Sequence, residues 1–313
     1  KRWQKTMLFV LNDNDEAGYF YNDLKTIAMP ENGQEQAAEV LFFTSSYRRA
    51  VKYGQRDAGN EILRTEVLSR LSVINEVKST ASLPLCIVTE PSALAELVVA
   101  KHKLDEHTLS VSVGQTMDLT ETEKTLRSYG FQQVDYVYEP GQFAVRGSIL
   151  DVYSFSSELP YRIDFFGNDV DTIRTFEVET QLSKDKKEKV EIVPELATLS
   201  EEKIPFLQFL PKDSVLVMKD LLYIHDTIER IYNDGFTAQA LTEQLEGKTE
   251  TEQNELRKQL QANLQLITAQ QFTDDALNFK RIEFGANRAN EESKAIIRFN
   301  ISPQPLFHKN FEL

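Results

Sequence analysis

The chain has 313 residues, of which 41% are hydrophobic and 27% are charged, as in globular rather than disordered proteins. This length favours two or three domains over a single core. The formal net charge of −14 argues against a general nucleic-acid binder, because phosphate contacts need clustered lysines and arginines. No apolar run approaches the roughly 20 residues that span a bilayer, so we expect no membrane segment.

The single cysteine and the scattered histidines limit the chemistry that the chain can perform. Cys86 excludes an internal disulfide and favours the cytoplasm as the compartment. It lies in the apolar run LCIV, which predicts a buried strand residue rather than a nucleophile. The four histidines show no metal-ligand spacing, so we expect no metal and no cofactor. The chain begins in a strand and ends in a proline-containing connector, and we interpret it as a piece of a longer protein.

Strand and helix patterns alternate over residues 1–107. Short continuous apolar runs are typical of buried parallel strands, and apolar residues at helical spacing fall between them. The strands are expected at 6–11, 40–44 and 84–89, and the helices at 16–27, 58–75 and 91–100. This alternation predicts a parallel α/β layer.

The pattern changes near residue 108, where polar and apolar residues begin to alternate as in a half-exposed strand. A helix is expected over 120–130, followed by strands at 132–139, 142–154, 161–166 and 169–178. Short glycine-containing loops separate these strands, which predicts an antiparallel meander. We place this second domain at 108–190 and expect it to end in a charged turn over 184–189.

The α/β pattern returns in the third segment, 191–313. Strands are expected at 190–194 and 214–218, a helix at 219–235, and a leucine-striped helix within 238–270 that packs onto the domain. The first and third segments each hold an incomplete α/β sheet. We therefore predict that they pack together as one body.

Signals for common enzyme classes are missing. The chain contains no G-x-x-x-x-G-K-[ST] loop, no D-E-x-x box after an apolar strand, no G-x-S-x-G and no H-E-x-x-H. Glu90 follows an apolar strand and has the chemistry to hold Mg²⁺, but without a phosphate-binding loop we prefer a structural role for it. We predict that this chain is not an enzyme.

A basic run at 45–56 carries Arg48, Arg49, Lys52 and Arg56. These four side chains are weak candidates for contacts with a phosphate backbone. We prefer the alternative that they pair with acidic neighbours on the surface, because single basic clusters are common there.

The stretch QFAVRGSILDVYS, residues 142–154, holds one basic residue in an otherwise strand-like run. Phe143 and Val145 share one face, whereas regular pairing would put Leu150 and Val152 on the other. A bulge at Gly147 would shift the phase by one residue and turn all four apolar side chains into the core. Arg146 would then point to the open face of the sheet.

The next strand, YRIDFF, supports an unusual open face. Arg162, Asp164 and Phe166 alternate with apolar residues that suit the core, and Arg174 on the following strand extends the same patch. Two interpretations are open on the pattern alone. In the first, Phe166 packs against a neighbouring domain and the arginines pair with local acids. In the second, the face binds another protein, since arginine and aromatic residues are enriched at binding hot spots.

A resemblance to a known family adds to this pattern. The string EPGQFAVRGSILDVYSFSSELPYRIDFFGNDVDTIRTFEVETQ resembles the second domain of the bacterial transcription-repair coupling factors, and more loosely the matching domain of the excision-nuclease subunit UvrB. The likeness is dense over about 130–181, and YGQRDAGNEILRTEVLSRL and LCIVTEPSALAE extend it. UvrB is the weaker match, because the stretch from Thr44 to Ile62 is too short for its long aromatic hairpin.

The resemblance implies a fold and a partner. The fold is a degenerate helicase-like parallel α/β body, made of two chain segments, with an inserted and mainly antiparallel β domain that binds the damage-recognition ATPase UvrA. The family's UvrA-contact positions fall on Arg146, Arg162 and Phe166, with Arg174 and Asp164 as further candidates. The resemblance also implies a longer protein that translocates on double-stranded DNA by ATP hydrolysis, binds RNA polymerase, and masks this face with its own C-terminal regulatory domain.

Two hypotheses follow. In the first, the chain is a non-catalytic adaptor that recruits UvrA in transcription-coupled nucleotide excision repair. In the second, it is a UvrB-like domain that handles DNA or a nucleotide and keeps residual catalysis. The second predicts ATP binding or salt-dependent DNA binding through the basic run at 45–56.

Overall fold

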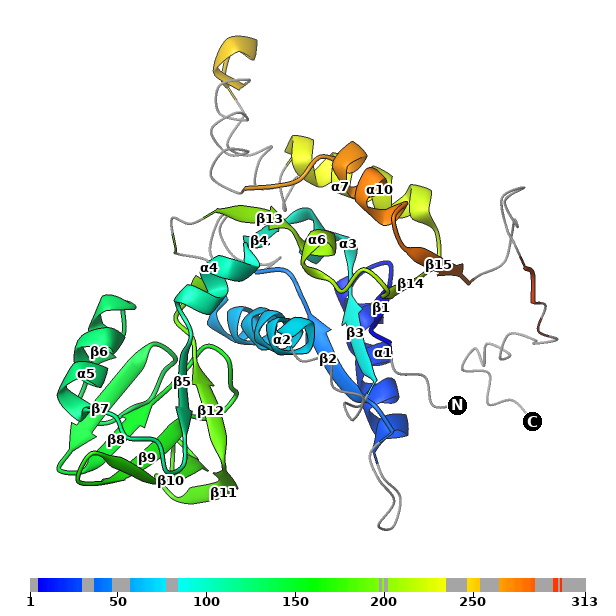
Figure 1. The fold of residues 1–313 in the computed structure, drawn as a ribbon. Helices are drawn as coiled ribbons and strands as arrows, with labels where there is room; N and C mark the ends of the chain where they lie inside the picture. The colour runs from blue at the N-terminus through cyan, green and yellow to red at the C-terminus, as the bar shows by residue number, and fades with distance from the viewer. Residues whose placement is uncertain are drawn as a thin grey trace, which may run out of the picture.

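Figure 1 shows the computed structural model, in which a parallel α/β body and a smaller β-rich body are joined through α4 and β5. The structure describes residues 5–29, 37–46, 57–76, 84–196, 199, 202–234, 247–253, 265–284, 295–297 and 299. The predicted α/β class is confirmed, whereas the helicase-like ancestry and the domain boundaries stay predictions.

The larger body is built on a five-stranded parallel sheet with the order β15-β14-β1-β3-β2. Three strands come from the first segment: β1 (Met7–Val10), β2 (Glu39–Phe43) and β3 (Leu85–Thr89). The other two, β14 (Val215–Met218) and β15 (Lys280–Glu283), come from the third. The β-rich body is therefore inserted between two pieces of one sheet.

Helices cover both faces of the parallel sheet, which explains its continuous apolar strands. Along β3, Leu85 and Ile87 join the core that includes α2, α3, α7 and α10, while Cys86 and Val88 join the core under α1. These helices are α1 (Asn14–Ala28), α2 (Ala58–Glu76), α3 (Pro91–Ala95), α7 (Leu221–Asp234) and α10 (Ala269–Ala276). Burial raises the pKa of the Cys86 thiol to about 11, which agrees with its predicted structural role.

The inserted body contains a six-stranded sheet with the order β11-β10-β9-β8-β7-β6. Its strands are β6 (Gln132–Gln133), β7 (Gln142–Arg146), β8 (Ile149–Val152), β9 (Tyr161–Phe166), β10 (Asp169–Phe176) and β11 (Ser183–Lys187). The pairs from β7 to β11 are antiparallel, as predicted. Its core lies between the sheet, α5 (Leu119–Ser128) and the pair formed by β5 (Leu109–Ser112) and β12 (Lys189–Ile192).

Gly147 does not form a bulge, so that prediction is wrong. β7 and β8 are two strands of a tight hairpin, in which Gly147 and Ser148 form the loop and Arg146 pairs with Ile149. Gly147 has φ +63°, the conformation that such loops need at their first position. The hairpin places Phe143 opposite Val152 and Val145 opposite Leu150, so each pair shares one face of the sheet. Phe143, Leu150 and Val152 therefore enter the core, and Val145 packs against it.

Four further segments differ from the sequence predictions. The expected helix at 91–100 breaks after Ala95, because β4 (Leu97–Val99) pairs with β13 (Lys203–Pro205) before α4 (Lys101–Glu106) begins. Of 132–139, only Gln132 and Gln133 form a strand. The charged stretch at 184–189 contains the edge strand β11 instead of a turn. The strand expected at 190–194 is β12, which pairs with β5 of the inserted body.

Two predictions on the larger body fall outside the residues that the structure describes. These are the basic run at Arg48, Arg49, Lys52 and Arg56, and most of the leucine-striped helix within 238–270. Among the described helices, none is long and apolar enough to cross a membrane.

Candidate protein-docking face

One face of the six-stranded sheet looks away from the main core of the inserted body, and we call it the docking face. The register places Asp151 opposite Arg162, Arg162 opposite Arg174, and Asp164 opposite Ile149. Residues directly opposite each other in a sheet share a face. The docking face comprises Arg146, Ile149, Asp151, Arg162, Asp164, Phe166, Thr172 and Arg174. All the sequence-predicted contact residues therefore lie on one side.

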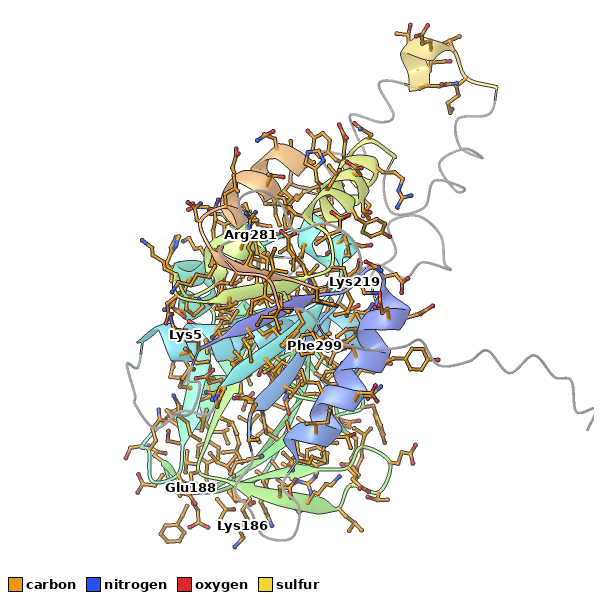
Figure 2. All side chains as sticks on the ribbon, turned by 90° about the vertical axis from the view of Figure 1, so that its right-hand side faces the viewer. Lys5, Lys186, Glu188, Lys219, Arg281 and Phe299 are labelled. Carbon is orange, nitrogen blue, oxygen red and sulfur yellow. The ribbon has the colours of Figure 1, made fainter. Side chains whose placement is uncertain are left out.

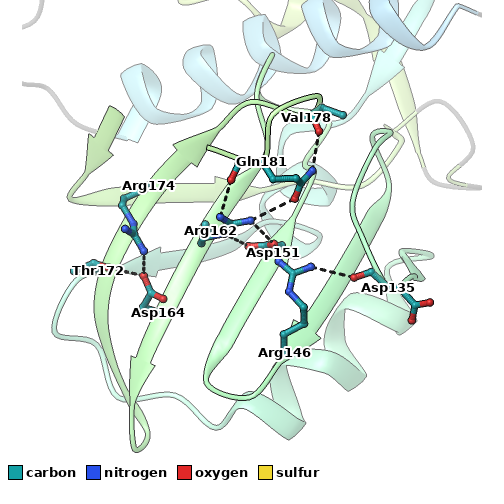
Figure 3. Close-up of polar contacts among 9 residues, drawn as sticks. All are labelled: Asp135, Arg146, Asp151, Arg162, Asp164, Thr172, Arg174, Val178 and Gln181. Atoms are coloured by element: carbon teal, nitrogen blue, oxygen red, sulfur yellow. Dashed lines mark hydrogen bonds and ion pairs between the residues drawn. The ribbon is translucent and has the colours of Figure 1, made fainter. Parts of the chain in front are cut away.

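Asp151 is the centre of this face and is fully buried. Its Oδ1 accepts a hydrogen bond from Arg162 Nε at 2.7 Å, and its Oδ2 accepts one from Arg162 Nη2 at 2.9 Å. The same Oδ2 also pairs with Nη2 of Arg146. Figure 3 shows the two guanidinium groups converging on this one carboxylate. Two positive charges against one negative charge leave a net charge of about +1 at the cluster, by simple count of the three ionised groups.

Arg162 contacts three other groups of the inserted body. Besides Asp151, its Nη1 donates to the backbone oxygen of Gln181 at 3.0 Å, and its guanidinium lies 4.4 Å from the ring centroid of Phe176. Only 15% of its side chain is exposed. The hydrogen bonds to Asp151 raise the pKa of Arg162 above its ordinary value. This guanidinium is largely engaged within the chain.

Arg146 is more open, with 35% of its side chain exposed. Its Nη1 donates to the backbone oxygen of Asp135 at 3.0 Å, and its guanidinium lies 5.0 Å from the ring centroid of Tyr136. The residue comes last in β7, directly before the Gly147 turn, so its outer edge is accessible to a partner.

A second ion pair lies on the neighbouring strands. Asp164 Oδ2 pairs with Nη2 of Arg174 and accepts a hydrogen bond from Thr172 Oγ1 at 2.8 Å (Figure 3). The Nε of Arg174 is buried and has no hydrogen-bond partner among the described residues. Asp164 and Arg174 therefore balance each other on this face.

Phe166 is 82% exposed, the largest value among the exposed large apolar residues of the described chain. It is the last residue of β9, where Gly167, with φ +63°, turns the chain into β10. On the other side it borders the Gly147 turn, because Phe165 N donates to Ser148 O at 2.9 Å. Both turns begin with a glycine, so no side chain from Gly147 or Gly167 covers the ring.

Sequence reasoning missed Asp151. The available signal was an acidic residue in the middle of an apolar strand, at a position facing away from the core. Such residues are usually solvated, but here Asp151 is buried and bonded to two arginines. Val134 and Val137, before β7, and Val178, after β10, pack with Phe176 on this face.

Carboxylates already fill the positions at the carboxyl edge of the parallel sheet where a phosphate would bind. Asp13 accepts from Glu16 N at 2.9 Å as the N-cap of α1, and Glu16 pairs with Lys219, which lies beside α1 in Figure 2. Glu90 is the N-cap of α3, accepting from Ser92 N at 2.7 Å and Ala93 N at 3.1 Å. A helix N-terminus that holds its own carboxylate repels a phosphate. The structural role predicted for Glu90 is confirmed.

One group on α7 has the geometry of a metal site, which the histidine spacing did not predict. Ligand atoms of His225, Asp226 and Glu229 lie within 4.8 Å of one another. The two acids are exposed, and exposed clusters of this kind are common without an ion. The cluster lies on the larger body, away from the docking face, and we assign no metal to it.

Comparison with known proteins identifies the stretch that carries the docking face. Residues 109–197 match the family model described as the UvrB interaction domain. The matched stretch includes every docking-face residue, and it includes β12, in agreement with the pairing of that strand with β5.

The curated proteins similar to this chain include transcription-repair-coupling factors, which confirms the resemblance. The Escherichia coli (strain K12) protein is 32% identical over 128 residues, covering 41% of this chain and 11% of that protein. The Bacillus subtilis (strain 168) protein is 27% identical over 172 residues, covering 52% of this chain and 14% of that protein. The Staphylococcus aureus (strain USA300) protein is 37% identical over 86 residues, covering 28% of this chain and 7% of that protein. The chain thus matches about a tenth of the length of these relatives.

Proposed function

We propose that the chain is a non-catalytic adaptor module that recruits UvrA to stalled RNA polymerase in transcription-coupled nucleotide excision repair. The observation that carries this proposal is Phe166, an 82% exposed ring that shares a sheet face with Arg146 and Arg162, within the stretch that matches the UvrB interaction domain model. Exposing a phenylalanine to water is unfavourable, so a protein partner that covers it gains apolar burial. DNA translocation, ATP hydrolysis and RNA polymerase binding are proposed for a longer parent protein.

In this proposal the contact residues have two roles. Phe166 and Arg146 touch UvrA directly, because their side chains are accessible. Arg162 acts as a positioning residue, because Asp151, Gln181 and the ring of Phe176 already engage it. Arg174 and Asp164 neutralise each other beside Phe166 and offer hydrogen-bonding groups at the rim of the contact.

The competing hypothesis of a nucleotide- or DNA-handling domain has less support. The helix N-termini at the edge of the parallel sheet hold Asp13, Glu16 and Glu90. The net charge of −14 opposes phosphate binding over the chain as a whole.

Isothermal titration of the chain with purified UvrA tests the proposal. Phe166→Ala is expected to weaken binding by about 2 kcal/mol, roughly thirtyfold, as for a central aromatic anchor. Arg146→Ala removes one charge-assisted contact and is expected to weaken binding roughly tenfold. Phe166→Ala should unfold at the wild-type temperature, because the ring is exposed. Arg146→Ala also removes an ion pair to the buried Asp151, so it should unfold at a lower temperature, and its affinity is measured where circular dichroism shows the variant folded.

Tyr19→Ala is the matched control. Tyr19 is an aromatic residue that is 77% exposed, but it lies on α1 of the larger body. Its replacement should leave UvrA affinity unchanged. Wild-type affinity in both the Phe166 and the Arg146 variants would exclude the docking face as the UvrA site. Binding of ATP or of duplex DNA, without binding of UvrA, would favour the competing hypothesis.

A further inference from the structure

A loop with two exposed tyrosines borders the docking face. It connects β6 to β7 and spans residues 134–141. Val134 and Val137 pack into the small apolar cluster that includes Ala144 and Phe176. The tyrosines face the other way, since Tyr136 is 52% exposed and Tyr138 is 58% exposed. The buried valines fix the loop on the sheet, and the tyrosine rings are exposed to solvent.

The loop is held in one conformation by several bonds. Gln142 Oε1 accepts hydrogen bonds from the backbone nitrogens of Tyr138 at 2.9 Å and Glu139 at 3.1 Å. At its ends, Gln132 N donates to Gly141 O at 2.8 Å, and Val134 N donates to Phe143 O at 2.9 Å. A preorganised loop loses little conformational entropy on binding, and tyrosine side chains add a large contact area at low entropic cost.

Arg146 joins the loop to the docking face. Its Nη1 bonds to the backbone of Asp135, its guanidinium lies over the ring of Tyr136, and its Nη2 pairs with Asp151. Tyr136 is therefore joined to Arg146, Tyr138 lies two residues further along the same loop, and Phe166 shares the sheet face of Arg146. Tyrosine, arginine and phenylalanine side chains together form the composition typical of the centre of a protein interface.

We infer that Tyr136 and Tyr138 form a second contact element for the protein that binds the docking face. This inference rests on the proposed function, in which that protein is UvrA. The matching surface of UvrA would present an apolar recess for the two rings. It would also carry carboxylate or carbonyl oxygens that accept hydrogen bonds from the phenolic hydroxyls and from Arg146.

Titration of UvrA with the Tyr138→Ala and Tyr136→Ala variants of the full chain tests this inference. Each substitution is expected to weaken binding roughly tenfold, as for aromatic residues that contact a partner. Tyr138→Phe separates the ring from the hydroxyl and is expected to keep most of the affinity. Tyr138→Ala is the cleaner variant, because Tyr136 also supports Arg146. Tyr223→Ala is a control in the larger body, where that residue is 43% exposed on α7.

The outcomes separate the inference from the proposed function. If Phe166→Ala weakens binding but the double variant Tyr136→Ala/Tyr138→Ala binds as the wild type does, the second contact element is wrong and the proposed function stands. If the wild-type chain does not bind UvrA, both are wrong. Exposed tyrosines also stack on unpaired bases. A loss of affinity for a single-stranded oligonucleotide, with unchanged affinity for UvrA, would reassign the loop to nucleic acid.

Discussion

Replacing Asp151 with asparagine removes the negative charge at the centre of the docking face while keeping the size of the side chain. The carboxylate is fully buried and accepts two hydrogen bonds from Arg162 and one from Arg146. An asparagine offers one oxygen, and its amide group would face a guanidinium as a second donor. At least one guanidinium N–H donor therefore loses its acceptor.

The loss of stability in Asp151→Asn depends on how deeply Arg146 and Arg162 are buried. Removing one member of a fully buried ion pair costs about 3–5 kcal/mol. Here the side chains of Arg162 and Arg146 are 15% and 35% exposed, so water replaces part of the lost contact. We therefore expect Asp151→Asn to lower the free energy of unfolding of the inserted body by about 2–3 kcal/mol.

Urea denaturation followed by circular dichroism measures this loss. Asp164→Asn is the matched control, because Asp164 lies on the same face but is 21% exposed and pairs with only one arginine, Arg174. Its loss is expected to cost about 1 kcal/mol. A double-mutant cycle of Asp151→Asn with Arg162→Met should give a coupling energy above about 1 kcal/mol. Equal losses for Asp151→Asn and Asp164→Asn would refute the central position of Asp151.

Three further predictions concern stability and reactivity. Burial and the nearby carboxylates of Glu158 and Glu39 raise the pKa of Glu66 from 4.5 to about 7, so the folded chain holds this proton more tightly than the unfolded chain. The free energy of unfolding should therefore fall as the pH rises from 4.5 to about 7. Glu66→Gln should raise the free energy of unfolding by about 2–3 kcal/mol at pH 8 but change it little at pH 4. Thermal denaturation of both proteins at the two pH values checks this. Because burial raises the pKa of Cys86 to about 11, its thiol should react with a disulfide reagent at pH 8 only after unfolding; rapid reaction of the native chain would contradict this. Gly147→Ala should cost about 1–2 kcal/mol in urea denaturation from backbone strain alone, because φ is +63° and the added methyl group has free space.

The central strands of both sheets were predictable, because the order of apolar and polar residues shows which strands are buried. The edge strands β11 and β15 were not, since their residues are mostly exposed and charged. Continuous apolar runs, such as the one around Cys86, indicated a sheet covered on both faces, and the structure confirms it. Alternation along YRIDFF placed Arg162, Asp164 and Phe166 on one face, and the register confirms that as well.

Two features were beyond local pattern analysis. A one-residue bulge and a two-residue hairpin loop at Gly147 turn the same side chains into the core, so alternation alone does not distinguish them. Asp151 is engaged by Arg146 and Arg162, which in turn donate to the backbone oxygens of Asp135 and Gln181, outside the strand of Asp151. The sequence therefore indicated which residues share the docking face, but it did not indicate that Arg162 is already engaged by an internal carboxylate.

Hydrogen–deuterium exchange of the chain with and without UvrA tests the central claim most directly. The account predicts that UvrA slows exchange in the turns at Gly147-Ser148 and Gly167-Asn168 and in the loop at 134–141. It predicts no change in the parallel sheet or in α1. Protection confined to the larger body, with the turns of the inserted body exchanging at the rate of the free chain, would contradict it.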